Sequence, residues 1–427
     1  MNNKIIFNSA LLFIEKFIIL ALGLVNTLVI ARYAGKELFG NFAFIVSTAS
    51  LFLPFTLIGL NNVCSKYFIK YPKNSHHYLK AALIIRAIFA SLAILITFFV
   101  AKIYFNDELS PLVVLAVSLQ WFNIFTLIEF VYLANQHALK PTTIRVFCRL
   151  IAKLTLLFSV LNELPIIYWI LAIGCEYLLI ALSYIMIYIK DDIHLNDSHR
   201  RLFSTCKRLF KKSKWLFLSS IAAVLYLKID QVMLGVMLSS QDVAYYAAAA
   251  KLSEFWYIFP VLLANVFMPK LVNLYKVNKG GYWHLQRKLF LTLSTVALTL
   301  TVITYFAAPY IIHLLFGDGY APSSTILQIH ILGCLFIFNR AFISKWLILS
   351  NNYPYSLYSH GFGVIINLGL NYLLIPIYGG AGAAIASVAA YFAASFGFMF
   401  FFNRTKTFIF KIFQVSKSSE IEKRKLL

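Results

Sequence analysis

Long apolar runs, separated by short polar stretches, recur along the whole chain. A helix needs about 20 mostly apolar residues to cross the hydrocarbon layer of a membrane. Runs of this length lie at 9–31, 38–60, 80–104, 110–134, 142–161, 166–189, 214–238, 243–269, 288–315, 323–349, 355–377 and 380–402. The pattern predicts an all-α membrane protein with about 12 transmembrane helices.

The connections between the runs predict two halves of six helices. Tyr378, Gly379 and Gly380 favour a tight turn between the last two runs, and residues 162–165 separate the fifth and sixth. The predicted domains are a first bundle at 1–190, a basic linker at 191–213, a second bundle at 214–402 and a basic tail at 403–427. Because six is even, both halves cross the membrane in the same sense. We expect a pseudo-twofold axis along the membrane normal and a substrate site between the halves near the midplane.

The distribution of basic residues predicts the orientation. If the N-terminus is inside, the inner segments hold 26 Lys and Arg residues, and the outer segments hold three, which are Arg32, Lys36 and Lys102. Cytoplasmic loops of membrane proteins carry such an excess of Lys and Arg. We therefore predict a bacterial inner-membrane protein with both termini in the cytoplasm. The first apolar run contains Glu15 and Lys16, so we expect a retained span rather than a cleaved signal peptide.

Composition supports a lipid environment and excludes several other classes. The 427 residues are 61% hydrophobic and 13% charged, whereas soluble domains are closer to half apolar and a quarter charged. The net charge of +22 is spread over short segments, which disfavours nucleic acid as a partner and favours anionic membrane lipids. The five cysteines form no CxxC pair, and the histidines show no metal spacing. With no nucleotide loop or hydrolase pattern either, we expect no cofactor, no metal and no enzymatic activity.

Cationic residues inside the predicted spans point to an anionic substrate. Ionisable groups are costly in lipid and usually face a bundle interior or a wet cavity. Arg149 and Lys153 lie four residues apart on the fifth span, and Arg86 and Arg340 lie inside the third and tenth. An excess of fixed positive charge attracts anions, and guanidinium groups match phosphate geometry. We predict that these four residues bind a phosphate-bearing substrate. Arg145, nearer the inner interface, is expected to reach towards headgroups.

Four further charges lie on the seventh and eighth spans, which run antiparallel. Lys228 and Asp230 lie on one, and Lys251 and Glu254 lie on the other, at similar depths from the outer surface. Ion pairing that only holds the helices together and a functional role are both open. In the functional interpretation, Lys228 and Lys251 contribute to substrate binding. Asp230 or Glu254 would then bind a coupling proton or another cation.

Four segments in order along the chain resemble Wzx-type polysaccharide flippases. They are 31–42 (ARYAGKELFGNF), 228–235 (KIDQVMLG), 315–320 (LFGDGY) and 367–386 (NLGLNYLLIPIYGGAGAAIA). The last is similar to the glycine-rich hairpin that joins the final two spans of that family. Ala244 departs from the pattern, because relatives tend to have glycine before the following tyrosine.

The resemblance implies a fold, a substrate and partners. The fold is that of the multidrug/oligosaccharidyl-lipid/polysaccharide exporters, which is MATE-like. The implied substrate is an undecaprenyl-diphosphate-linked oligosaccharide, such as an O-antigen unit, moved from the cytoplasmic to the periplasmic leaflet by ion-coupled alternating access. A polysaccharide polymerase and a chain-length regulator are the implied protein partners.

Three other functions are compatible with many membrane spans. A multidrug or cation antiporter could share the fold, but its usual substrates are cationic and would be repelled by excess Arg and Lys. A polysaccharide polymerase or ligase tends to have a large outer loop, whereas the outer connections here are short. A lipid II flippase usually has two further spans.

Overall fold

The computed structural model describes residues 3–135, 137–191, 202–350 and 352–413, and this part is helical without strands. The helices of the first half are α1 (Asn3–Tyr33), α2 (Gly35–Leu57), α3 (Leu60–Lys70), α4 (Ser75–Tyr104), α5 (Leu109–Leu119), α6 (Ile128–Ala134), α7 (Leu139–Leu161) and α8 (Ile166–Lys190). The 3-10 segments η1 (Pro72–Asn74) and η2 (Gln120–Leu127) join some of them. The end of α7 and the start of α8 confirm the predicted break at 162–165.

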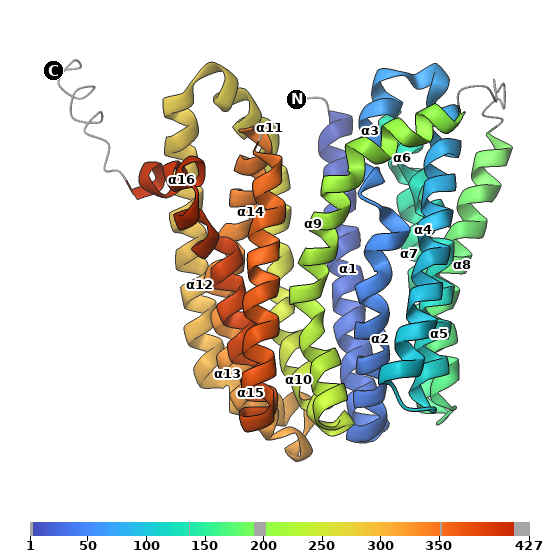
Figure 1. Cartoon of the computed structure of the whole chain (residues 1–427), viewed down its shortest axis with the longest axis vertical. Coiled ribbons are helices and arrows are strands. Elements are labelled where there is room, and N and C mark those ends of the chain that lie inside the picture. Colours follow the sequence, from blue (N-terminus) through green and yellow to red (C-terminus); the bar gives the residue numbers. More distant parts are fainter. Residues whose placement is uncertain (1–2, 136, 192–201, 351, 414–427) are drawn as a thin grey trace.

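The second half continues the same way (Figure 1). Its helices are α9 (Leu202–Met237), α10 (Ser240–Glu254), α11 (Ile258–Val277), α12 (Lys279–Phe316), α13 (Pro322–His330), α14 (Cys334–Leu349), α15 (Tyr353–Ser395) and α16 (Asn403–Phe413). Short 3-10 segments interrupt it at η4 (Phe255–Tyr257), η5 (Asp318–Tyr320), η6 (Ile331–Gly333) and η7 (Gly397–Phe401). Pairs such as α10 and α11, joined by η4, together form one membrane-crossing rod.

The described residues support the predicted twelve crossings. Ten helical stretches are long and apolar enough to span a membrane. An eleventh crossing is α7, which is long and apolar but carries the three cations Arg145, Arg149 and Lys153. The twelfth arises because α15 bends at Gly379 (φ 55°, ψ −134°) into two antiparallel passes. At Gly382 a Cβ would lie 2.3 Å from the Leu374 carbonyl oxygen, so this hairpin closes only with glycine there.

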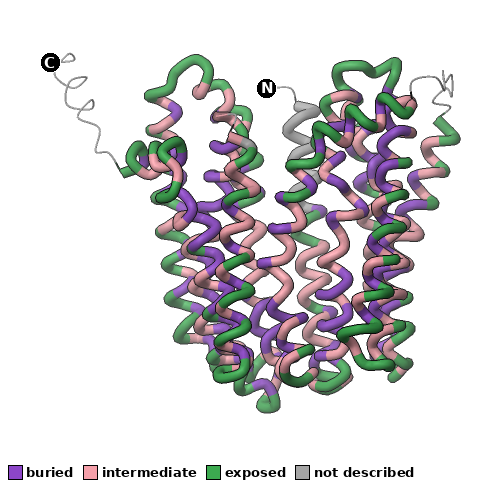
Figure 2. The backbone as a smooth tube through the Cα atoms, in the orientation of Figure 1, coloured by how far each residue is buried: buried purple, intermediate pink, exposed green. Residues whose placement is uncertain are grey.

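Side-chain burial confirms that the protein is a multi-pass membrane protein. Buried residues concentrate inside each group of helices, while many outward faces are exposed (Figure 2). These exposed faces are apolar, with Phe306 78% and Ile365 69% exposed on α12 and α15. Exposed apolar patches of this extent require a lipid solvent.

The two halves meet around α9, which packs against α2 and α4 of the first half and along α15 of the second. The first turn of α1 and the helix α16 lie towards one end of the molecule, which we call the termini end (Figure 1). At the opposite end, α10 packs on α1 and α2. There Gly40 approaches Ser240 so closely that a Cβ would lie 1.8 Å from the Ser240 carbonyl oxygen.

The seal between the halves is therefore at the opposite end. Arg32 Nε donates to the Leu315 carbonyl at 2.8 Å, and the Tyr320 hydroxyl donates to the Ala31 carbonyl at 3.2 Å. Towards the termini end, α11 packs instead on α12 and α14 of its own half. Contacts of α1 and α2 with the second half thus close the opposite end, whereas nearer the termini the second half reaches the first through α9.

The predicted linker and the predicted tail are more helical than expected. Residues 202–213 of the predicted linker form the first turns of α9, and the tail begins with α16, a short helix lying across the bundle (Figure 1). Arg404, Lys406 and Lys411 lie on α16, while its Phe408 and Ile412 are buried. Residues 192–201 of the linker and 414–427 of the tail lie outside the described part of the chain.

Candidate functional site

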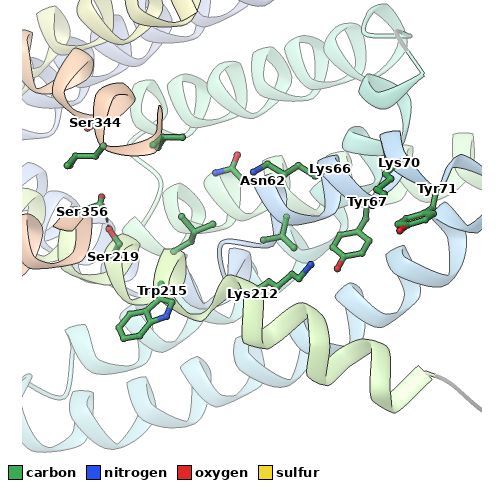
Figure 3. Close-up of a pocket in the computed structure, with 14 residues that line it drawn as sticks. Asn62, Lys66, Tyr67, Lys70, Tyr71, Lys212, Trp215, Ser219, Ser344 and Ser356 are labelled. Atoms are coloured by element: carbon green, nitrogen blue, oxygen red, sulfur yellow. Dashed lines mark hydrogen bonds between the residues drawn. The ribbon is translucent and has the colours of Figure 1, made fainter. Parts of the chain in front are cut away.

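Two cavities lie between the halves, at different depths. The central cavity, of about 180 Å³, is bounded by α1, α2 and α7 of the first half and by α9 and α10 of the second. The termini-side cavity, of about 540 Å³, is bounded by α3, α9, α14 and the start of α15 (Figure 3). Because α9 lines both, this helix forms a common wall along the cleft.

Charged side chains from both halves gather at the central cavity. Lys153 comes from α7, Lys228 from α9, and Lys251 and Glu254 from α10. Glu254 accepts from the Lys228 ammonium at 2.8 and 3.0 Å, which forms one of the predicted ion pairs. Lys251 lies within electrostatic range of Lys153, Lys228 and Glu254. The cavity therefore brings together four of the predicted site residues.

The charges at this cavity do not balance. Among the described residues, Lys153 and Lys251 have no carboxylate partner, so three lysines face one glutamate. Like charges that are held close together away from bulk water repel strongly, and a bound anion would lower this repulsion energy. An anionic group such as a phosphate would balance this charge and accept hydrogen bonds from these donors.

Neutral polar residues complete the walls. Ser47 on α2 donates to Gln231 on α9, a bond that crosses between the halves. Asn26 on α1 donates through Nδ2 to the Lys153 carbonyl at 3.3 Å, which ties α1 to α7. Sequence reasoning missed these residues, although each interrupts an apolar run and so carried a weak signal.

Asp230 lies outside the central cavity, within the second half. It is 1% exposed and accepts from Asn367 Nδ2 at 2.8 Å, Asn371 Nδ2 at 2.6 Å and the Tyr246 hydroxyl at 2.8 Å. The Ser387 hydroxyl is a further donor. The open prediction that it pairs with a lysine is thus replaced by four neutral donors from α10 and α15. Asn367 and Asn371 lie four residues apart in an apolar span, a pattern that indicates a buried polar site. These residues entered the sequence-based prediction only as part of the family resemblance.

Arg149 lines neither of the two cavities, and its charge is largely neutralised. Its Nε donates to Glu176 at 2.9 Å, and its Nη1 lies 3.8 Å from Glu15. Arg145 binds both Glu15 and Glu129, which corrects the prediction that it extends towards headgroups. Two arginines here meet three carboxylates, so this part of α7 offers no excess positive charge to a ligand.

Arg86 and Arg340 do not lie on either cavity, which corrects their predicted placement. Arg86 is fully buried and donates to the Ile124 carbonyl at 2.9 Å and to Asn61. Ile124 lies in η2, where helical hydrogen bonding changes.

Arg340 has a similar structural role in the second half, where it also donates to a backbone carbonyl. It is 7% exposed, and it donates to the Ala394 carbonyl at 2.9 Å and contacts His360 Nε2 at 3.3 Å. Ala394 lies in the last turn of α15, where helix carbonyls lack intrahelical partners. In this conformation both arginines stabilise helix breaks.

Comparisons with known proteins agree with this architecture. A family model described as "Polysaccharide biosynthesis protein" matches residues 5–275. The capsular polysaccharide biosynthesis protein CapF of Staphylococcus aureus is 25% identical over 387 residues, which cover 88% of this chain and 94% of CapF. A Shigella flexneri protein described provisionally as an O-antigen transporter is 24% identical over 204 residues, or 47% of each chain.

Two solved structures share the fold. The lipid II flippase MurJ, in an inward closed conformation, matches with a TM-score of 0.71 at 16% identity, covering 91% of this chain and 86% of MurJ. An inward-facing multidrug resistance MATE family transporter matches with a TM-score of 0.68 at 12% identity, covering 91% and 94%. Both matches extend through the two halves and confirm the predicted MATE-like architecture.

Proposed function

The chain belongs to the family of polysaccharide biosynthesis proteins, and we propose that it is a flippase for an undecaprenyl-diphosphate-linked oligosaccharide. The lipid-linked sugar moves from the cytoplasmic to the periplasmic leaflet of a bacterial inner membrane, without any chemical conversion. On the periplasmic side a polysaccharide polymerase, limited by a chain-length regulator, is the expected consumer of the product.

The observation that carries the proposal is the unbalanced positive charge of the central cavity. Lys153 and Lys251 come from different halves, and both lie beside the Lys228–Glu254 pair. A diphosphate placed there contacts both halves at once, so its binding free energy can bias their relative position. The volume of about 180 Å³ suits a phosphate group better than a chain of sugars.

The orientation follows from the excess of Lys and Arg at the termini end, which we assign to the cytoplasm. The structure is sealed at the opposite end, where Gly40 meets Ser240. This arrangement fits the cytoplasm-facing stage of an alternating-access cycle. The polyprenyl chain remains in lipid while the charged headgroup crosses between the halves.

Asp230 is the favoured candidate for binding a coupling cation or proton, rather than Glu254. Glu254 already has Lys228 as its counter-charge, whereas Asp230 is held by neutral donors only. The Asn371 Oδ1 atom, buried beside it, has no hydrogen-bond partner among the described residues. A small cation bound by Asp230 would take up this oxygen together with those of Ser387 and Tyr246.

The proposal is tested by lipid transport in proteoliposomes. The probe is undecaprenyl diphosphate carrying one fluorescent N-acetylhexosamine. Replacing Lys153 or Lys251 by Gln should lower its transport by about tenfold or more, because a hydrogen bond to a charged group contributes about 1.5–3 kcal/mol. Lys102→Gln is the control, since Lys102 is exposed near the opposite end and stacks on Phe98. Transport of the probe by wild type at the rate of empty liposomes would overturn the proposal.

The same proteoliposomes, loaded with ethidium in place of the lipid probe, test the cation antiporter. A cavity with three lysines and one glutamate repels organic cations. Extrusion of ethidium by the wild-type protein, abolished by Glu254→Gln, would favour the antiporter over the flippase.

A further inference from the structure

We propose that the termini-side cavity is a second binding site, which holds the phosphate and first sugar of the substrate before they reach the central cavity. This inference rests on the proposed flippase function. It gives a role to lysines of this cavity that otherwise contribute only to the charge distribution used to predict the orientation of the chain.

The walls of this cavity carry cations without carboxylates. Lys66 and Lys70 come from α3, and Lys212 comes from α9 across the cavity (Figure 3). The described lining residues include no Asp or Glu. Asn62 adds an amide on the α3 side, and Figure 3 shows it beside Lys66. These groups supply several donors to an anion and no competing negative charge.

Aromatic rings lie beside the lysines. The Lys212 ammonium lies 5.0 Å from the Tyr67 ring centroid, and the Lys70 ammonium lies 5.2 Å from that of Tyr71. Tyr67 also packs on the buried Tyr78, with ring centroids 4.7 Å apart, which fixes its orientation. Trp215, one turn along α9 from Lys212, is 46% exposed. An aromatic face beside an ammonium matches a phosphorylated sugar, whose C–H face packs on the ring while its phosphate meets the cation.

The position along α9 explains why two sites are useful. Lys212 and Lys228 are 16 residues apart on one helix, which is about 24 Å at 1.5 Å per residue. Lys212 lies towards the termini end, where the headgroup of a cytoplasmic-leaflet lipid first meets the protein. A headgroup of several sugars can therefore be held at the larger cavity before its diphosphate advances to the lysines at mid-depth.

The aromatic rings also separate this role from simple lipid adhesion. An anionic phospholipid headgroup would use the lysines but would gain nothing specific from Trp215 or Tyr71. A phosphosugar uses both kinds of group. Removing a ring should consequently affect a sugar-bearing lipid more than a sugar-free one.

The experiment uses the full chain in nanodiscs for binding and in proteoliposomes for transport. The probes are undecaprenyl diphosphate with and without one N-acetylhexosamine. Lys212→Ala should raise the half-saturating concentration of both probes roughly fivefold and leave the maximal transport rate unchanged. Lys212→Arg should remain within about twofold of wild type, because the charge is retained. Lys211→Ala is the matched control, since Lys211 is exposed and adjacent but does not line the cavity.

Trp215→Ala should weaken binding of the sugar-bearing probe at least threefold and leave the sugar-free probe unchanged. Equal loss for both probes, or full competition by phosphatidylglycerol, would mean a headgroup site for ordinary lipids and would overturn the inference. If Lys212→Ala and Lys211→Ala behave alike while wild type transports the probe, only this inference fails. If wild type transports nothing, the proposed function fails first.

Discussion

Replacing Gly40 by alanine should unseal the opposite end of the protein. A Cβ at this position would lie 1.8 Å from the Ser240 carbonyl oxygen and 2.5 Å from its carbon. Ordinary contacts of a Cβ begin near 3.4 Å. The obstacle is backbone, so no side-chain rotation relieves it. Helices α2 and α10 must move apart by more than 1 Å, and the hydrogen bond from Ser240 to Asn41 is lost with them.

The cost of this overpacking falls on one conformation. Inserting a methyl group into a packed contact costs about 1–3 kcal/mol. The contact exists only while the halves are closed at the opposite end, so the conformation described here bears the whole cost. That free energy changes the ratio of the two conformations by roughly 5- to 150-fold in favour of opening. Transport should fall because the return to the loading state becomes unfavourable.

Labelling of a cysteine introduced at Asn41 measures the seal, after the five native cysteines are replaced. A membrane-impermeant maleimide added from the periplasmic side should react several-fold faster in Gly40→Ala than in the parent. Gly361→Ala is the control, because no atom lies within 4 Å of the added methyl. Unchanged labelling and transport in Gly40→Ala would show that this contact does not close the protein.

Three further outcomes follow from the site. Asp230→Asn should remove any dependence of transport on a proton or sodium gradient and slow transport about tenfold, as measured in proteoliposomes with and without the gradient. Glu254→Gln should tighten binding of undecaprenyl diphosphate, since Lys228 loses its counter-charge; weaker binding would contradict the charge argument. Arg86→Ala should lower unfolding stability by about 2–4 kcal/mol in thermal denaturation, and the folded fraction should bind the lipid normally.

The fold was predictable because every membrane crossing needs an apolar run of similar minimum length, and such runs are visible in the sequence. Turns were recognisable wherever glycine or proline falls between runs, as at Gly379. Even α7 was recognisable, although its three cations make it less apolar than its neighbours. The beginning of α9 was not, because residues 202–213 are too polar to read as a membrane span and become helical as an extension of one.

The sequence predicted that the site is cationic, but it predicted only in part which residues line the cavities. The sequence indicates how deep a charge lies, but not which face of its helix meets a cavity. Arg86 and Arg340 have the same residue type and setting as a phosphate ligand, yet both point at carbonyls of distorted helices. Those carbonyls lie 38 and 54 residues away in the chain, so only the packing of the helices reveals them.

The distribution of the few carboxylates explains how a strongly cationic protein can direct an anion. On α7, Arg145 and Arg149 are neutralised by Glu15, Glu129 and Glu176, whereas Lys153, one turn further on, meets no carboxylate among the described residues. Lys212 and Lys251 likewise face cavities that hold more cations than anions. Along α7, positive charge is thus compensated at Arg145 and Arg149 and left uncompensated at Lys153, on the cavity wall. Under the proposed function, a phosphate that enters the cleft would be drawn to the two cavities, which α9 connects.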